Sequence, residues 1–204
     1  MNGSSPWNRT IGAVVLAAGL SSRMGRPKMV LPWGRTTIIG QVVSVLQQSG
    51  VSEIVVVTGG AQHELEAALQ KAAVKIEFNP RYQEDSMVLS LQVGVNHLGP
   101  SVEAVLVALG DQPQIQVKIA RSVIQAYLET DSLLVAPSYQ RRRGHPWLVA
   151  RHLWQDILTL QPSETLRTFF AAHHEHIYYL NVDDDSVLRD LDTPADYERE
   201  KPIA

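Results

Sequence analysis

Short runs rich in valine and isoleucine alternate with amphipathic stretches along most of this sequence. The apolar runs lie at residues 12–16, 53–57, 74–78, 104–108 and 132–136. Runs of this kind are typical of strands that are buried on both faces of a parallel sheet. The stretches between them repeat apolar residues with helical period, at residues 37–50, 62–71, 86–97 and 117–130. This alternation predicts a three-layer α/β/α fold of the Rossmann-like kind, with a mostly parallel sheet.

The pattern is less regular after Pro137. We expect residues 146–149 to form a strand in a small antiparallel extension of the sheet. Two helices and a strand are expected to follow, near residues 151–158, 164–172 and 177–180. Thr193 and Pro194 predict a last helix, with Thr193 as N-cap and Pro194 at the first helical position. We therefore expect a flexible N-terminus over residues 1–10 and a single domain over residues 11–200.

The composition excludes several classes of protein. The 204 residues are 45% hydrophobic, enough for a folded core, and the net charge of -3 is too balanced for a dedicated nucleic-acid binder. The chain has no cysteine, which excludes disulfides, thiolate metal sites and a thiol nucleophile. Its apolar runs are far shorter than the roughly 20 residues of a membrane helix, and the first ten residues do not form a secretory signal. We expect a cytoplasmic protein that does not bind a membrane.

The loop after the first predicted strand combines small residues with basic ones. It runs from Leu16 to Lys28 and reads Leu-Ala-Ala-Gly-Leu-Ser-Ser-Arg-Met-Gly-Arg-Pro-Lys. Ligands of open parallel sheets bind beyond the carboxyl ends of strands, where this loop begins. Its small residues let backbone N–H groups approach an anion, and Arg23 and Lys28 add positive charge suited to a triphosphate. The alternative is an ordinary strand–helix loop with two stray basic residues.

Carboxylates occupy two further places of interest. Asp111, in a Gly-Asp-Gln-Pro segment, follows the strand at residues 104–108 and would face the phosphate loop, where Mg²⁺ would bridge carboxylate and phosphate. The alternative for this segment is a plain β-turn. Asp190 and Asp192 alternate around Leu191, so on an extended segment both point to the same side. The alternative role of Asp192 is helix capping.

A third region, Arg141–His145, places three arginines before Gly144 and Pro146. An arginine cluster can bind the phosphate of an acceptor through charge-assisted hydrogen bonds, although such turns are more often solvated. His145 either contacts the acceptor, or accepts its proton, or is a structural histidine before a proline. We expect His173–His176 to be exposed surface, Trp154 to pack in the core, and Trp147 to be a candidate for stacking on a ring.

Together these motifs resemble the MobA-like nucleotidyltransferases of molybdenum-cofactor maturation, over residues 11 to about 198. The resemblance is carried by the loop at residues 16–28, by Gly-Asp-Gln-Pro, by Asp-x-Asp-Thr-Pro at residues 190–194 and by Gly-His-Pro at residues 144–146. It implies a nucleotidyltransferase fold and the transfer of a nucleoside monophosphate onto a phosphorylated acceptor, with release of pyrophosphate. The expected catalytic residues are Arg23, Lys28 and Asp111. The expected Mg²⁺ ligands are Asp111, Asp190 and Asp192, and the expected acceptor contacts are Arg143, Gly144 and His145.

The resemblance also implies which residues hold the nucleoside triphosphate. They are Leu16, Ala17, Ala18, Gly19, Arg23, Met24, Gly25, Lys28, Thr58, Gly59, Ser90 and Asp111. Leu-Ala-Ala-Gly with Leu-Gly-Asp-Gln-Pro resembles the cytidylyltransferase branch, which favours CTP as donor and molybdopterin as acceptor. A molybdenum hydroxylase or its chaperone would then receive the product. Ser86, Val88 and Leu89 depart from the family's Gly-x-x-Ser-Ser-Leu-x-x-Gly pattern, so GTP as the donor and a sugar phosphate as the acceptor are alternatives. A nucleotide-binding accessory protein that no longer transfers is a further alternative, against which the intact set of Arg23, Lys28, Asp111 and Asp190 argues.

Overall fold

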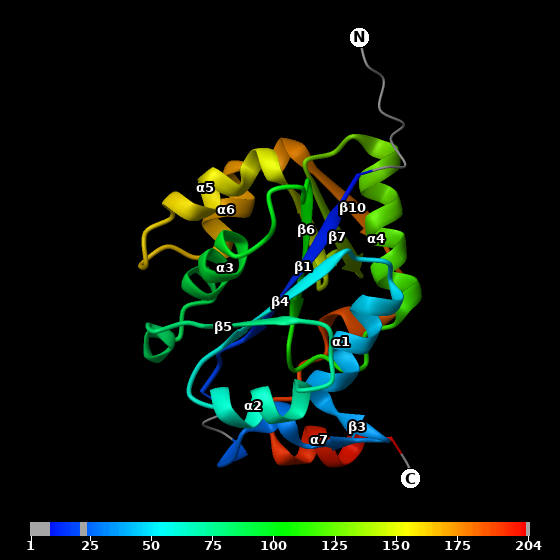
Figure 1. Cartoon of the computed structure of the whole chain (residues 1–204). Helices are drawn as coiled ribbons and strands as arrows, with labels where there is room; N and C mark the ends of the chain where they lie inside the picture. The colour runs from blue at the N-terminus through cyan, green and yellow to red at the C-terminus, as the bar shows by residue number, and fades with distance from the viewer. Residues whose placement is uncertain (1–8, 21–23, 203–204) are drawn as a thin grey trace.

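A computed structural model describes residues 9–20 and 24–202, and its centre is a mixed sheet between helices (Figure 1). The strands of the central path are β1 (Ile11–Ala17), β4 (Glu53–Thr58), β5 (Lys75–Phe78), β6 (Ala104–Leu109), β7 (Leu134–Tyr139), β9 (Trp147–Ala150) and β10 (Ile177–Asn181). Their spatial order is β10-β7-β9-β6-β1-β4-β5. All of them run in one direction except β9, which is antiparallel to β6 and β7. The mostly parallel α/β fold expected from the sequence is confirmed.

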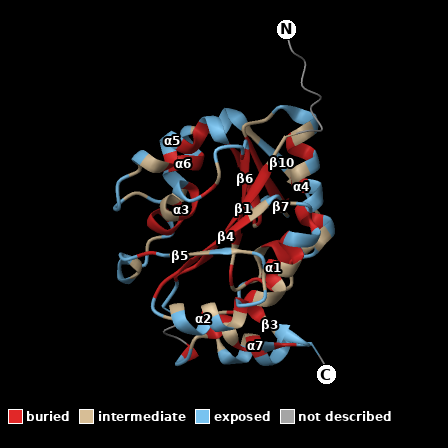
Figure 2. Ribbon diagram, in the orientation of Figure 1, coloured by how far each residue is buried: buried red, intermediate tan, exposed pale blue. Residues whose placement is uncertain are grey.

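Helices cover both faces of this sheet because successive strand residues point to opposite sides. The helices of one layer are α1 (Ile38–Gln48), α2 (Gln62–Leu69) and α4 (Val117–Thr130). Those of the other layer are α3 (Met87–Asn96), α5 (Trp154–Thr159) and α6 (Leu166–Ala172). In β1, Ala13 and Val15 pack with the first layer, whereas Val14 and Leu16 pack with the second. Figure 2 shows the resulting concentration of buried residues in the strands and on the inner sides of the helices.

The antiparallel part of the sheet lies in a different place from the one expected. The strand predicted near residues 146–149 is β9, and it lies inside the sheet between β6 and β7 instead of extending its side. The short strand β8 (Arg142–Arg143) is the element that extends the sheet, by pairing with the end of β7. Gln140 and Arg141, in the turn between them, both have positive φ. This hairpin reverses the chain, and β9 then enters the sheet between two strands that run the other way.

A third, smaller apolar cluster joins residues 24–38 to the C-terminal segment. It contains Met24, Leu31, Trp33, Ile38, Leu191 and Tyr197. The cluster brings the hairpin of β2 (Pro32–Trp33) and β3 (Thr36–Thr37) against the last helix, α7 (Pro194–Glu200), which lies beside it in Figure 1. The Tyr197 hydroxyl donates a hydrogen bond of 2.8 Å to the Pro32 carbonyl. As the sequence predicted, Thr193 caps α7, and Pro194 stands at its start.

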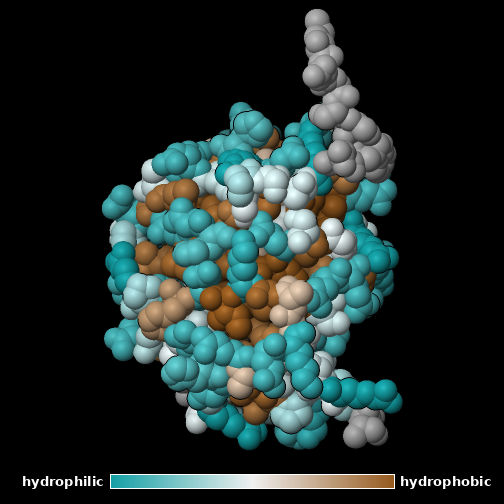
Figure 3. All heavy atoms as spheres, in the orientation of Figure 1, coloured by the Kyte–Doolittle hydropathy of each residue, from teal (hydrophilic) through white to brown (hydrophobic). Residues whose placement is uncertain are grey.

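The remaining elements are short 3-10 turns, of which residues 28–30 and 82–84 contribute to the site described below. In the face shown in Figure 3, apolar atoms gather over the middle of the view, and polar atoms surround them. Of the N-terminal segment at residues 1–10, only Arg9 and Thr10 belong to the described part. The Arg9 guanidinium pairs with Asp131 at 2.9 Å. Within the described residues, no helix has the length and apolar character needed to cross a membrane.

Candidate active site

A cleft of about 360 Å³ opens at the carboxyl ends of β1 and β6. Eight of the residues singled out from the sequence line it: Leu16, Ala18, Gly19, Lys28, Ser90, Asp111, Asp190 and Asp192. They come from the loop after β1, the first part of α3, the turn after β6 and the segment before α7. The topology therefore gathers side chains from distant parts of the sequence at the strand ends, where open α/β sheets bind their ligands.

Among the described residues that line the cleft, Lys28 is the cation. It begins the 3-10 turn Lys28–Val30, and its side chain is only 9% exposed. The Nζ atom lies 2.5 Å from Asp111 Oδ2 and 3.2 Å from Asp192 Oδ1. Burial by itself would lower the pKa of Lys28, but the charge of Asp111 and the hydrogen bonds to both carboxylates raise it above its ordinary value. Lys28 is therefore fully charged at neutral pH and holds two carboxylates from different elements.

Asp190 belongs to the same acidic group. The Gln112 side-chain amide donates a hydrogen bond of 2.6 Å to Asp190 Oδ1, and the Leu191 N–H donates one of 3.2 Å to the Asp111 carbonyl. Burial raises the pKa of Asp190, and the negative charges of Asp111 and Asp192 raise it further. The turn after β6 and the segment before α7 are thus bound to each other by a side-chain and a backbone hydrogen bond.

Leu191 explains why both neighbouring carboxylates enter the cleft. Its side chain is fully buried in the third apolar cluster, whereas Asp190 and Asp192 line the cleft on the other side of the segment. This is the arrangement expected for two residues that alternate around an apolar one. The cap of α7 is made by Thr193 and Asp196, so helix capping is not the role of Asp192.

The donor set fits a divalent cation that binds together with a triphosphate. Within the described parts of the chain, no three acidic or histidine side chains form a ready-made metal cluster. Mg²⁺ does not require one, because it is usually held by one or two carboxylates together with substrate phosphates and water. The mutual repulsion that raises the pKa of Asp190 beside Asp111 is the kind of crowding that a divalent cation relieves.

Several residues expected to touch the nucleotide support the cleft from behind. Ala17 is buried at the end of β1, and Met24 belongs to the third apolar cluster. Thr58 is fully buried, and its hydroxyl donates a hydrogen bond of 3.2 Å to the Glu77 carbonyl. None of these side chains lines the cleft, because the sheet and its helices enclose them. Nucleotide contact by their backbone remains a prediction.

Of the three other predicted nucleotide positions, Gly25 and Gly59 belong to the described residues. Gly25 has a φ of +64, a conformation that glycine adopts without strain. A Cβ at Gly59 would lie 2.6 Å from the Ala18 carbonyl oxygen and 2.8 Å from the Tyr82 Cβ, so only glycine fits there. Arg23 lies outside the described residues, and its predicted role stays a prediction.

The cleft also contains residues that the sequence analysis did not select. They include Leu20, Tyr82, Asp85 and Met87, from the loop after β1 and from the segment that leads into α3. Asp85 has a φ of 49, and Ser86 is the N-cap of α3 with its side chain accepting a hydrogen bond from the Leu89 N–H. The sequence did hold one signal for this wall, because a serine before an apolar run is a common N-cap.

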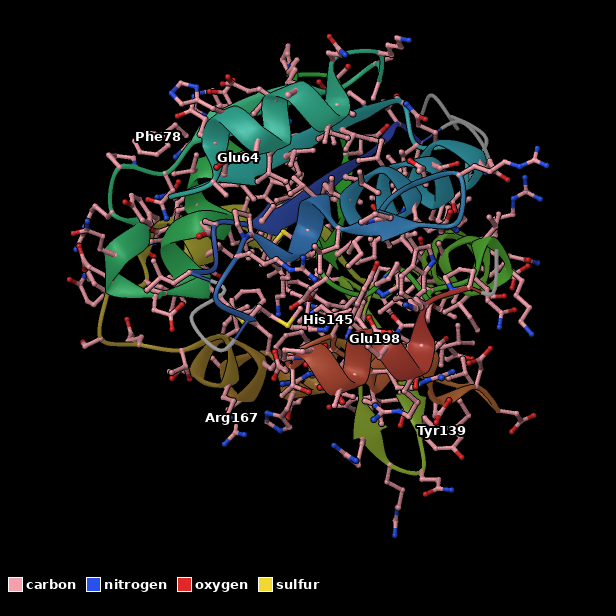
Figure 4. The ribbon with its side chains drawn as sticks, turned by 90° about the horizontal axis from the view of Figure 1, so that it is seen from below. Glu64, Phe78, Tyr139, His145, Arg167 and Glu198 are labelled. Carbon is pink, nitrogen blue, oxygen red and sulfur yellow. The ribbon has the colours of Figure 1, made fainter. Side chains whose placement is uncertain are left out.

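A second cavity, of about 580 Å³, adjoins the cleft and is called the acceptor cavity below. Arg143, Gly144 and His145, the three expected acceptor contacts, all line it. The cavity and the cleft share Asp85, Ser86 and Met87 as lining residues, so they meet at the start of α3. Figure 4 looks onto this edge of the sheet and shows His145 near the middle of the view, with Arg167, another lining residue, below and to the left of it.

The backbone fixes this segment tightly. The His145 N–H donates a hydrogen bond of 2.9 Å to the Val187 carbonyl, and the peptide bond to Pro146 is cis. A Cβ at Gly144 would collide with the Val187 carbonyl oxygen. Burial, and then the positive charge of Arg143, lower the pKa of His145 to about 4. The imidazole is therefore neutral at pH 7 and a weak base, which suits a hydrogen-bonding contact better than a proton acceptor.

The residues near this cavity separate into exposed and buried ones. Arg141 and Arg142 are exposed, and Arg143 is partly buried. Trp154 is buried in the core as expected. The segment at residues 173–176 is exposed as expected except for His173, which is partly buried against the Phe169 ring.

Comparison with known proteins agrees with this geometry. The model of the MobA-like NTP transferase domain matches residues 13–177. The chain is 30% identical to the molybdenum cofactor cytidylyltransferase of Escherichia coli (strain K12), over 92% of this chain and 93% of that protein. It is 28% identical to a probable molybdenum cofactor guanylyltransferase of Bacillus cytotoxicus, over 86% of each chain.

Solved structures show the same similarity. The crystal structure of Rv0371c from Mycobacterium tuberculosis H37Rv superposes with a TM-score of 0.82 and 28% identity, over 94% of this chain and 97% of that one. A complex of Rv0371c with manganese superposes with a TM-score of 0.79 and 27% identity, over 93% of this chain and 97% of that one. Because the family model matches most of its length, the chain belongs to the MobA-like NTP transferase family.

Proposed function

We propose that this protein transfers a cytidylyl group from CTP to the phosphate of a molybdopterin-type acceptor and releases pyrophosphate. The observation that carries the proposal is the single cleft in which Lys28 and the carboxylates Asp111, Asp190 and Asp192 meet. A buried cation beside a carboxylate group at strand ends suits a triphosphate and its divalent metal. The similarity to the cytidylyltransferase of E. coli supports CTP as the donor.

The residues of the cleft would work mainly by position and charge. Asp111 and Asp190 are the proposed ligands of Mg²⁺, and the manganese complex of Rv0371c supports a divalent cation. When bound, such a cation withdraws charge from phosphate oxygens and favours attack on the α-phosphorus. Lys28 holds Asp111 in place and offers a positive charge to the oxygens that become more negative. Phosphoryl-type transfer needs little more than alignment and charge stabilisation, so no protein nucleophile is required.

The acceptor would bind in the acceptor cavity and reach the cleft where the two meet, beside Asp85, Ser86 and Met87. A phosphate monoester has its second pKa near about 6, so its oxygen is already ionised at neutral pH. It therefore needs no general base, which agrees with the pKa of about 4 for His145. His145 would position the acceptor as a neutral imidazole.

The test is pyrophosphate release from each of the four nucleoside triphosphates, with and without molybdopterin, in Mg²⁺ or Mn²⁺. We expect release that requires both CTP and the acceptor. Asp111→Asn should lower turnover by several orders of magnitude, because several kcal/mol of transition-state stabilisation depend on the metal. Glu64→Gln, at an exposed position of α2, should leave turnover unchanged. Release that depends on GTP or on a sugar phosphate would replace the specific assignment. Binding without turnover for any acceptor would favour an accessory role.

A further inference from the structure

The acceptor cavity contains a cation stacked on an aromatic ring. The guanidinium carbon of Arg143 lies 3.6 Å from the centroid of the Phe170 ring. Phe170 is itself held edge-on by Trp147, at 4.9 Å and 74°, and by Phe169, at 5.8 Å and 78°. Trp147 and Phe169 are each 1% exposed. The stack therefore rests on a rigid, close-packed aromatic group.

The main chain keeps Arg143 in this position. Arg143 pairs with Ser138 in the short hairpin of β7 and β8. The next residue, Gly144, lies too close to Val187 for any side chain, and its N–H donates to the Pro137 carbonyl at 2.9 Å. The backbone at Arg143 is thus fixed by the fold, and the guanidinium lies over the Phe170 ring.

The stack faces the acceptor cavity and not the core. Arg143, Trp147 and Phe170 all line that cavity, and Met87, which is 43% exposed, contributes to it from α3. Within the described residues, the Arg143 guanidinium has no hydrogen-bond or ion-pair partner, so its N–H groups are open to a ligand in the plane of the stack. Met87 and Leu166 add apolar surface to the lining.

These features select a planar ligand. A guanidinium is weakly hydrated and stacks on flat π-systems, while its in-plane N–H groups bind carbonyl or ring-nitrogen acceptors. Resting on the function proposed above, we propose that Arg143 and Phe170 form a stacking platform for a fused nitrogen heterocycle of the pterin kind, which gives the acceptor its specificity. A sugar phosphate has no flat face for this platform and would leave the aromatic and apolar lining unmatched.

This role differs from the one the sequence suggested for Arg143, which was pairing with the acceptor's phosphate. Arg143→Lys separates the two roles, because lysine keeps the positive charge but has no plane. Arg142→Lys is the matched control, since Arg142 is the neighbouring arginine, is exposed and does not line the cavity. Phe170→Leu removes the ring beneath the guanidinium and is the second variant of the platform.

The experiment titrates the intact protein with 6-hydroxymethylpterin, a pterin without phosphate, and follows the quenching of pterin fluorescence. We expect Arg143→Lys to weaken binding about fivefold to tenfold, Phe170→Leu to weaken it by a similar factor, and Arg142→Lys to change it less than about twofold. Ribose 5-phosphate should not displace the pterin. Unchanged pterin affinity in Arg143→Lys would overturn the platform, and so would displacement by ribose 5-phosphate.

The same proteins distinguish this inference from the proposed function. If CTP turnover with molybdopterin is normal but pterin binding is insensitive to Arg143→Lys, the platform is wrong and the cytidylyltransferase assignment stands. If the pterin binds and depends on Arg143 while no nucleoside triphosphate is turned over, the platform stands and the assignment fails. Because the probe has no phosphate, its binding reports the ring alone.

Discussion

Leu191 connects the stability of the C-terminal region with the geometry of the acidic group, and Leu191→Ala tests that connection. The side chain is 0% exposed and packs in a cluster with Trp33, Ile38 and Tyr197, among others. Truncating a fully buried leucine leaves a cavity and costs about 3 kcal/mol of unfolding free energy, within a usual range of about 2–5 kcal/mol. For a chain of 204 residues, a loss of about 3 kcal/mol lowers Tm by about 6–12 °C.

The same change should reduce turnover at temperatures where the variant is still folded. Asp190 and Asp192 flank Leu191, and the Leu191 N–H donates a hydrogen bond to the Asp111 carbonyl. Without the buried Leu191 side chain, this segment can shift and displace the three carboxylates together. A displacement of about 1 Å in such a site can cost on the order of 100-fold in rate. We expect Leu191→Ala to need a higher Mg²⁺ concentration than the wild type for half-maximal turnover with CTP and acceptor at 20 °C. Urea unfolding of the same variant measures the loss of unfolding free energy.

Leu46→Ala is the matched control. Leu46 is 1% exposed in α1 and packs in the cluster on one face of the sheet, not in the cluster that holds Leu191. It should lose a similar unfolding free energy and keep the wild-type metal dependence. If Leu191→Ala is destabilised to the same extent but shows the metal dependence of Leu46→Ala, the argument that Leu191 positions the carboxylates is refuted.

Three further changes probe other parts of the site. Lys28→Ala should lower kcat for CTP more than it raises KM, because its charge acts mainly on the transferring phosphate; steady-state kinetics with a raised KM alone would make Lys28 a binding residue. His145 has a folded pKa of about 4, below its unfolded value, so the wild type should lose about 2 kcal/mol between pH 7 and pH 5 that His145→Gln does not lose, as urea unfolding at both pH values would show. Gly144→Ala collides with Val187 and should cost about 1–3 kcal/mol in unfolding free energy, with a raised KM for the acceptor and an unchanged KM for CTP.

Local sequence determined most of the secondary structure and the family. The helix expected at residues 117–130 is α4 with the same bounds, and Thr193 with Pro194 begins α7 as predicted. These features depend on periodicity and on capping chemistry, which act between residues a few positions apart. The motif at residues 16–28 and the Gly-Asp-Gln-Pro segment identified the family for the same reason, since each is a continuous stretch of chain.

Tertiary structure decided where these elements meet. The Lys28 pair with Asp192 spans 164 positions in the sequence, and β9 enters the sheet between two strands that run the other way. It also decided that Thr58 supports the cleft from behind, and that the Arg143 guanidinium stacks on Phe170 while lining a cavity. Such contacts form only when the two apolar layers and the third cluster have packed. Local periodicity fixes which face of an element is buried, whereas the partner it is buried against depends on the close packing of the whole chain.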